Sequence, residues 1–392
     1  MKKKLLVLGE SYMNLQMHTN PVTKDEKTTY GDTYSFHPYG VGATTAISAA
    51  KLGADCTFCT KLGDDQNGER LKKYYKSCGI DTSFVTTDKN SKTGMSVTLF
   101  SDNQNGHTYI SKSANLTLSK KDIEDAFSSC PDMFIVPQDI LVSENTNSSE
   151  VIEEDEADTP TEMIDISEVT EAAPADNNAV KDEEENDFSQ TIVFSNKITE
   201  TENAKPEKEA KKEKKPVYSD PYKDNLSMYA INLAEEKHVD LFVHYGKNSS
   251  KLPLNKINGI KILVISDEAL YDASGIFPNS IDKTLRAIIP FAAKIHSKYY
   301  VIQQGNDKAF IYDGKYYEII TLPAPLKAKA HQESPRMHGT YIGALAARFL
   351  ETNDIMDACR YAGVVSIMTR SKFGCLDHAP TRDEVAEFTA EQ

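Results

Sequence analysis

Residues His331–Leu350 read HQESPRMHGTYIGALAARFL, and the interpretation of the whole chain starts from this stretch. A polar loop with one proline leads into an apolar segment, and Gly339 and Thr340 mark the junction. The small residues that follow predict a buried helix whose small face lets a sheet approach closely: Gly343, Ala344, Ala346 and Ala347. Because the first N–H groups of a helix are unpaired and its dipole is positive there, such a junction is suited to bind an anion. On the local pattern alone, a helix start that only packs is the more common explanation.

Short apolar runs alternate with helical patterns along the rest of the chain. Strands are expected at Lys4–Gly9, Asp55–Lys61, Asp132–Pro137, Leu241–His244, Lys261–Ser266 and Tyr299–Gln303. Helices are expected at Ala43–Leu52, Asn67–Gly79, Lys120–Ser128, Leu226–Lys237, Asp282–His296 and Ile355–Thr369. This alternation predicts the α/β class, with a Rossmann-like parallel sheet covered by helices on both faces. Residues 10–38 alternate polar and aromatic side chains and are expected to form exposed strands, followed by a flexible loop at Tyr39–Gly42.

Charge is concentrated in one internal segment. The chain has a net charge of −15, and residues 144–215 hold 22 acidic and 8 basic side chains, which leaves the remainder close to neutral. A segment this charged and this poor in aromatic residues does not bury enough apolar area to offset its ordering entropy. We therefore expect a disordered insertion at 144–215 between two parts of one folded core, 1–143 and 216–392. The core shows no basic face, so no nucleic-acid partner is expected.

Neither export nor membrane insertion is expected. The apolar run near the N-terminus, Leu5–Leu8, is too short for a signal peptide, and no run approaches the ~18 apolar residues of a membrane span. Six cysteines in a long chain of this kind predict reduced thiols and a cytoplasmic location. Cys56 and Cys59 form a C-x-x-C pair on an expected strand, where residues three apart point to opposite faces, so metal or redox chemistry is not expected there.

Several motifs in the correct order resemble the pfkB (ribokinase-like) family of sugar and nucleoside kinases. The segment TYIGAL at Thr340–Leu345 resembles the end of the family signature DTTGAGDTFxGAL. Residues 37–46, HPYGVGATTA, resemble the first signature, which contains GGKGAN. Further matches are AKLGA at 50–54, LGDDQNG at 62–68, GIDT at 79–82, TG at 93–94, SAN at 113–115 and GNDKA at 305–309.

The resemblance implies a ribokinase-like core with a small β lid, formed here by residues 11–38 and 93–113. It implies ATP and Mg2+ as cofactors and a sugar or nucleoside as substrate. It also implies a homodimer formed through the lid, while the acidic insertion is a candidate docking segment for a protein partner.

The reacting positions of the family are altered. The catalytic Asp, which acts as general base, falls on Gly339, which has no side chain. The GAG turn that forms the anion hole becomes Arg336-Met337-His338, next to Thr340, and side chains there crowd a phosphate. Arg336 alternatively places its guanidinium in the anion hole. His338 is a candidate substitute base, because its unperturbed pKa lies near neutrality, but an ordinary surface or core histidine is the more common case.

The substrate side is altered as well. The sugar-gripping Asp of the family falls on Asn14, which can donate and accept but carries no charge. Gly40 and Gly42 of the first signature keep a close backbone approach, while Thr44 replaces its Asn. The metal-associated NxxE motif aligns with Ser266–Ala269, where Asp267 and Glu268 are the remaining carboxylates.

Three hypotheses remain open. The first is a pfkB-type carbohydrate or nucleoside kinase-like protein with impaired phosphotransfer and retained ligand binding. The second is an active, divergent kinase with His338 or Asp267 as a substitute base. The third is a non-catalytic scaffold or regulator that acts through the acidic insertion.

Overall fold

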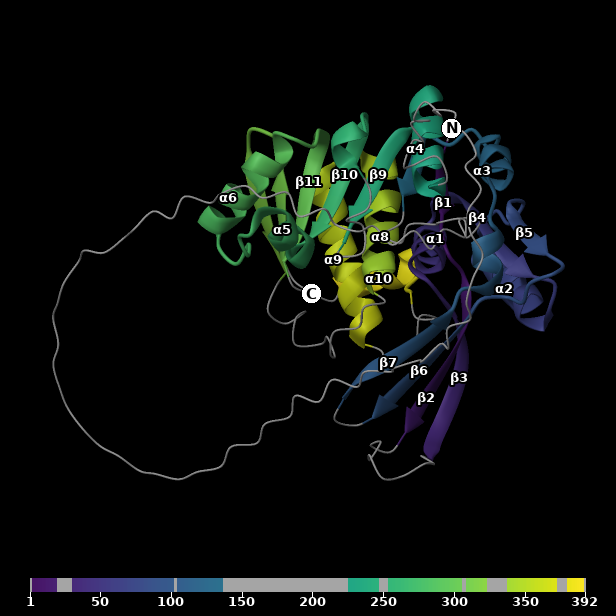
Figure 1. The fold of residues 1–392 in the computed structure, drawn as a ribbon. Coiled ribbons are helices and arrows are strands. Elements are labelled where there is room, and N and C mark those ends of the chain that lie inside the picture. Colours follow the sequence, from purple (N-terminus) through teal and green to yellow (C-terminus); the bar gives the residue numbers. More distant parts are fainter. Residues whose placement is uncertain are drawn as a thin grey trace, which may run out of the picture. The chain divides into compact units, whose positions relative to one another are not determined.

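The apolar run KLLVL forms strand β1 (Lys4–Leu8), whose last four residues are buried as expected for a strand inside a parallel sheet. β1 lies within a nine-stranded sheet of order β13-β12-β11-β10-β9-β8-β1-β4-β5 (Figure 1). The other strands are β4 (Asp55–Gly63), β5 (Val85–Asp88), β8 (Met133–Val136), β9 (Asp240–Tyr245), β10 (Ile260–Ser266), β11 (Ser297–Gln304), β12 (Lys308–Tyr312) and β13 (Tyr317–Thr321). All neighbours pair in parallel except the β11–β12–β13 edge, which is antiparallel.

This structure is a computed structural model that describes residues 2–19, 30–101, 104–136, 225–246, 253–304, 308–322, 337–371 and 379–390. The predicted insertion at 144–215 lies outside the described residues, so its predicted disorder and boundaries stay predictions. Within the described ranges, no helix is long and apolar enough to cross a membrane.

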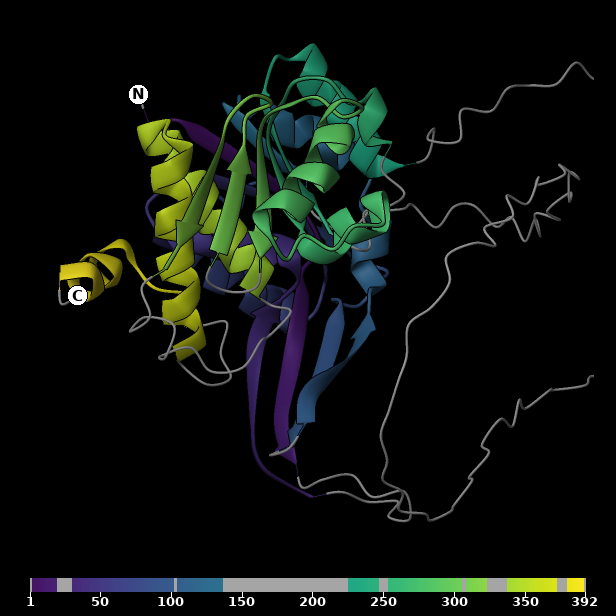
Figure 2. The same cartoon turned by 90° about the vertical axis from the view of Figure 1, so that its left-hand side faces the viewer.

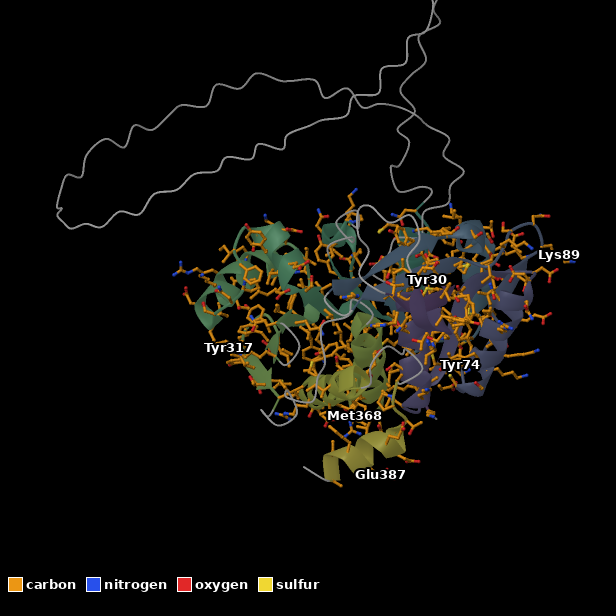
Figure 3. The ribbon with its side chains drawn as sticks, turned by 90° about the horizontal axis from the view of Figure 1, so that it is seen from below. Tyr30, Tyr74, Lys89, Tyr317, Met368 and Glu387 are labelled. Carbon is orange, nitrogen blue, oxygen red and sulfur yellow. The ribbon has the colours of Figure 1, made fainter. Side chains whose placement is uncertain are left out.

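Helices cover both faces of the large sheet, which confirms the predicted α/β class. One face packs against α1 (Val41–Lys51), α2 (Gln66–Ser77), α8 (Met337–Thr352), α9 (Ile355–Ser371) and α10 (Arg382–Ala390). The other packs against α3 (Lys120–Phe127), α4 (Leu226–Glu236), α5 (Asp267–Ser274) and α6 (Ile281–Ala292). Figure 2 shows the yellow α8 and α9 on one side of the sheet and the green α5 and α6 on the other. In Figure 3, Lys89, which follows β5, and Tyr317 on β13 lie near opposite ends of this sheet.

A second, four-stranded sheet of order β3-β2-β6-β7 is inserted between core elements, and we call it the lid (Figure 1). Its strands are β2 (Tyr12–Thr19), β3 (Gly31–Tyr39), β6 (Met95–Ser101) and β7 (Gln104–Ser111). The register places Asn14 beside His37 and Ser96, so these polar residues share one face, the inner face. All three are buried. The expectation that residues 10–38 form merely exposed strands is therefore wrong for this face.

The opposite, outer face of the lid is apolar and solvent-exposed. Tyr34 and Phe36 on β3 and Tyr109 on β7 are 69%, 45% and 60% exposed. Strand pairing aligns Phe36 and Tyr109 with the half-buried Leu15 and Val97 on the strands between, and Tyr34 with the half-buried Met17. On β2 and β3 the polar residues near Asn14 and His37 thus point inward, and the apolar residues Leu15 and Phe36 point outward.

Other local predictions had mixed outcomes. The loop expected at Tyr39–Gly42 is wrong in part, because α1 already begins at Val41 with Gly40 as its N-cap. The pattern also gave no sign of the short elements β5 and α5. Cys56 and Cys59 do face opposite sides of β4, one in each apolar core, as predicted. Burial raises the pKa of both thiols far above the usual range.

Candidate functional site

The C-terminal end of β1 is the point at which the connections of the sheet diverge. β4 pairs with one edge of β1 and β8 with the other. In open α/β sheets, ligands bind beyond the carboxyl ends of the strands at such a switch point. Gly9 and Glu10 directly follow β1, the start of α1 lies beside them and the first turn of α8 packs against α1, so we place the candidate site here.

The glycines of the first signature are needed for packing. Gly40 has φ = 112°, and a Cβ there would lie 2.5 Å from the carbonyl oxygen of Glu10. A Cβ on Gly42 would lie 2.6 Å from the Cα of Gly9. Only glycine lets the first turn of α1 approach the end of β1 this closely. The substrate-binding role predicted for Gly40 and Gly42 stays a prediction.

Gly339 lies in the first turn of α8, where that turn packs against α1. A Cβ at position 339 would lie 1.9 Å from Oγ1 of Thr44 and 2.9 Å from the carbonyl oxygen of Val41. Thr44 is 4% exposed, and its hydroxyl donates to the carbonyls of Gly40 and Val41 at 3.0 and 3.1 Å. The hydroxyl of Thr44 therefore fills the space into which a side chain at position 339 would extend.

Thr340 contributes its backbone to the same helix contact. It is buried, and its carbonyl accepts a hydrogen bond of 3.0 Å from the Ser48 hydroxyl of α1. One turn further, a Cβ on Gly343 would lie 2.4 Å from the carbonyl oxygen of Thr45. The small-residue face predicted from the sequence thus packs against helix α1 rather than directly against a sheet.

Asn14 is the polar centre of the inner face of the lid. It is fully buried, and its Oδ1 accepts hydrogen bonds from Ser96 Oγ at 2.8 Å and Thr98 Oγ1 at 3.1 Å. Its Nδ2 has no hydrogen-bond partner among the described residues. A buried amide donor left without a partner is costly, because it has lost its water. The Asn14 amide is therefore available to a ligand that offers an acceptor.

Carboxylates near the switch point already accept hydrogen bonds from groups of the protein. The Glu10 side chain is 6% exposed; its Oε1 accepts from Lys112 Nζ at 2.8 Å and its Oε2 from the Tyr12 hydroxyl. Asp267 and Glu268 lie in the first turn of α5, directly after β10. Oδ1 of Asp267 accepts from the backbone N–H of Glu268 at 2.9 Å.

Three predicted residues cannot be compared with the structure in full. Arg336 lies outside the described residues, as do the side chains of Met337 and His338, although the backbone of the latter two opens α8. The roles predicted for them in an anion hole or as a substitute base stay predictions. Among the described residues, no group of three or more His, Cys, Asp or Glu side chains is arranged to hold a metal ion.

Sequence reasoning missed the steric role of Thr44 and the contacts of Glu10 with Lys112 and Tyr12. A Thr in place of the family Asn did signal a changed pocket, but not that its hydroxyl meets position 339. The contacts of Thr44 with position 339 and of Glu10 with Lys112 join residues about 100 or more positions apart in the chain, so no local pattern reveals them.

The nine-stranded sheet with helices on both faces and the four-stranded lid place the chain in the α/β class. Residues 2–145 match the model of the pfkB family carbohydrate kinases. The N-terminal part of the chain is thus similar to the pfkB family carbohydrate kinases, and the fold of the chain is ribokinase-like.

Curated relatives match the same N-terminal part. The chain is 32% identical over 124 residues to the bifunctional ribokinase/ribose-5-phosphate isomerase A of Fructilactobacillus sanfranciscensis, covering 31% of this chain and 23% of that protein. It is 28% identical over 126 residues to the ribokinase of Dictyostelium discoideum, covering 32% and 40%. The match therefore spans less than half the length of either relative.

Solved structures share the fold over the whole chain. The ribokinase of Arabidopsis thaliana complexed with ribose and ATP aligns with a TM-score of 0.65 at 15% identity, covering 99% of this chain and 98% of that one. A putative ribokinase II of E. coli in complex with ATP and Mg2+ aligns at 0.64 and 13% identity, with full coverage of both chains. At these identities the likeness establishes the fold alone.

Proposed function

We propose that this protein binds a sugar or nucleoside at the switch point as a pfkB-type kinase does, and that its phosphotransfer is impaired. One observation carries the proposal: position 339, where the family places its general base, is a glycine whose side-chain space is filled by Thr44 Oγ1, 1.9 Å from an ideal Cβ. General bases contribute roughly 10²–10⁴-fold to such reactions. A site without one would bind its ligands and turn them over slowly or not at all.

The inner face of the lid supports retained ligand binding. Asn14 offers an unpartnered amide N–H, and its neighbours Ser96 and Thr98 are uncharged hydroxyl residues. Neutral donors and acceptors of this kind suit a hydroxyl-bearing ligand, whose oxygens accept as well as donate. We assign Asn14, with Gly40, Gly42 and Thr44 at the floor of the site, to ligand binding.

ATP and Mg2+ are the cofactors of this proposal. Mg2+ is usually held by one or two carboxylates together with substrate phosphates, so Asp267 and Glu268 at the end of β10 would suffice to hold it. The metal would neutralise charge on the phosphates. The N-terminal turn of α8 would offer its unpaired N–H groups to the same anion.

A second copy of the chain is the proposed macromolecular partner. The exposed aromatic residues of the outer lid face, Tyr34, Phe36 and Tyr109, form an apolar surface of the kind that marks interaction sites. Tyr34 and Phe36 also pack edge to face at 6.0 Å, which keeps both rings on this surface. We propose that two lids meet through this face.

Two measurements on the purified full chain test the function. With ATP, Mg2+ and a panel of sugars and nucleosides, we expect no ADP release above background. ADP release that depends on one substrate would overturn the proposal that phosphotransfer is impaired. In a thermal-shift assay with the same panel, we expect at least one ligand to raise the midpoint, because a ligand that binds only the folded state stabilises it. No shift with any ligand would instead favour a scaffold that acts through residues 144–215.

A gain-of-function variant makes the test sharper. Gly339→Asp restores the family carboxylate, and Thr44→Ala removes the hydroxyl that would collide with it. Combined with Arg336→Gly and Met337→Ala, this variant is expected to gain ADP release that depends on the ligand found above, as the phosphoryl group of ATP passes to a ligand hydroxyl. The matched control is the same variant without Thr44→Ala, which should gain less.

A further inference from the structure

The junction between lid and core is held by side chains of motifs that the proposed function does not use. The chain first enters the lid after β1, through Gly9–Ser11, and finally leaves it after β7, through Lys112–Asn115; these are the two crossings considered below. Asn115 belongs to the SAN motif, which the sequence singled out only by resemblance. Both crossings lie within the described residues, and their side chains contact each other directly.

Asn115 hydrogen-bonds to both backbone groups of Ser11, a residue of the entering crossing. Its Oδ1 accepts from the backbone N–H of Ser11 at 2.8 Å, and its Nδ2 donates to the carbonyl of the same residue at 2.9 Å. The Nδ2 group also donates to the carbonyl of Lys112 at 2.9 Å. Asn115 is 5% exposed, so these hydrogen bonds are shielded from water and hold the two crossings in fixed register.

An ion pair between Lys112 and Glu10 is the second contact at the junction, and it lies closer to solvent. Lys112 Nζ lies 2.8 Å from Glu10 Oε1, and the Tyr12 hydroxyl donates to the other carboxylate oxygen. The Lys112 side chain is 44% exposed, whereas that of Glu10 is 6% exposed. An ion pair with one exposed partner is weakened by salt. This contact is therefore the weaker of the two.

The backbone of the junction is strained and crowded. Ser113 adopts φ = 49°, a left-handed conformation that non-glycine residues rarely take. A Cβ on Gly94 would lie 2.3 Å from Asn115 Nδ2 and 2.7 Å from the ring of Tyr12. The Gly94 carbonyl in turn accepts from the N–H of Met13 at 2.9 Å. Strained backbone of this kind persists only where its surroundings fix it.

We propose that Asn115 is a positioning residue. By fixing the backbone of Ser11 it sets the start of β2, and so it holds Asn14 in its ligand-facing place. The Lys112–Glu10 ion pair is a second, salt-sensitive contact that stabilises the same junction. Asn115 touches no ligand-facing group itself and acts through the backbone. Only the link to a ligand rests on the proposed function; the control of lid order does not.

Hydrogen exchange on the full chain, read by mass spectrometry, tests this directly. In Asn115→Ala, amides of β2 should exchange about tenfold faster, while those of β9–β11 stay within twofold of wild type, because exchange reports local opening. Lys112→Met, a surface change that leaves the core intact, should give a smaller acceleration limited to the lid. Wild type in high salt should resemble Lys112→Met, and Lys112→Arg should restore protection.

The matched control is Lys283→Met, an exposed lysine on α6, which should leave lid exchange unchanged. Equal acceleration in the lid and in β9–β11 would reduce Asn115 to a general stability residue and overturn the proposal, as would unchanged lid exchange in both Asn115→Ala and Lys112→Met. Calorimetric titration with D-ribose separates the two proposals. If the wild-type protein does not bind D-ribose, this result counts against the proposed function for this sugar. The hydrogen-exchange result still decides the role of Asn115.

Discussion

Replacing Gly339 by alanine adds one methyl group at the most crowded point of the candidate site. The new Cβ would lie 1.9 Å from Thr44 Oγ1, far inside contact distance, so Thr44 must rotate. Rotation breaks its hydrogen bonds to Gly40 and Val41, a loss of about 1 kcal/mol. Overpacking adds ~1–3 kcal/mol, and the helix propensity of alanine returns up to ~1 kcal/mol. We expect Gly339→Ala to lower the free energy of unfolding by roughly 1–3 kcal/mol.

Thr44, whose hydroxyl the new methyl group would meet, provides the internal control. Thr44→Ala removes the hydroxyl, so the double variant Gly339→Ala/Thr44→Ala should recover at least about 1 kcal/mol relative to the sum of the single changes. Gly363→Ala is the matched helical control. Its Cβ would meet mainly the flexible end of Leu322, at 2.9 Å, so that variant should stay close to wild-type stability.

Urea unfolding of the full chain, followed by circular dichroism, measures these differences. A lower midpoint at an unchanged slope reports lost stability rather than a changed unfolded state. If Gly339→Ala is as stable as wild type, or if the two substitutions are simply additive, then Thr44 does not fill the space of a side chain at position 339. The proposed reason for impaired catalysis would lose its structural basis.

Three further predictions follow from the same structure. Gly343→Ala should cost roughly 3 kcal/mol, measured by urea unfolding, because its Cβ would meet a backbone carbonyl of α1 at 2.4 Å that no side-chain change relieves. Burial tends to raise the pKa of Asp122, but hydrogen bonds from the α3 N-cap and from Lys61 outweigh it and hold this pKa below the usual value. Asp122→Asn should therefore lower stability at pH 7, and in urea titrations the difference should vanish as the pH falls through that depressed pKa. Tyr34→Ser with Tyr109→Ser should shift a dimer to monomer in analytical ultracentrifugation, and an unchanged mass would refute the outer lid face as the interface.

Much of the architecture could be read from periodicity. The runs at β1, β8 and β10 are continuous and apolar, as strands buried on both faces must be, and the small-residue helix α8 was recognisable from Gly339 onward. The short strand β5 escaped because its four residues, VTTD, carry no apolar pattern. The inner lid face was misread because polar side chains normally indicate exposure, whereas Asn14 is buried beside other polar groups.

The amino-acid sequence by itself determined the class of fold and the absence of a carboxylate at position 339, because periodicity and residue identity are local properties; the place of the lid came from the resemblance to a family. Only the tertiary structure decided that Thr44 fills that position, that Glu10 is engaged by Lys112, and that Asn115 holds Ser11. These contacts join distant parts of the chain at distances of a few ångströms. Their geometry depends on how α1, α8 and the lid pack together, which no local stretch of sequence specifies.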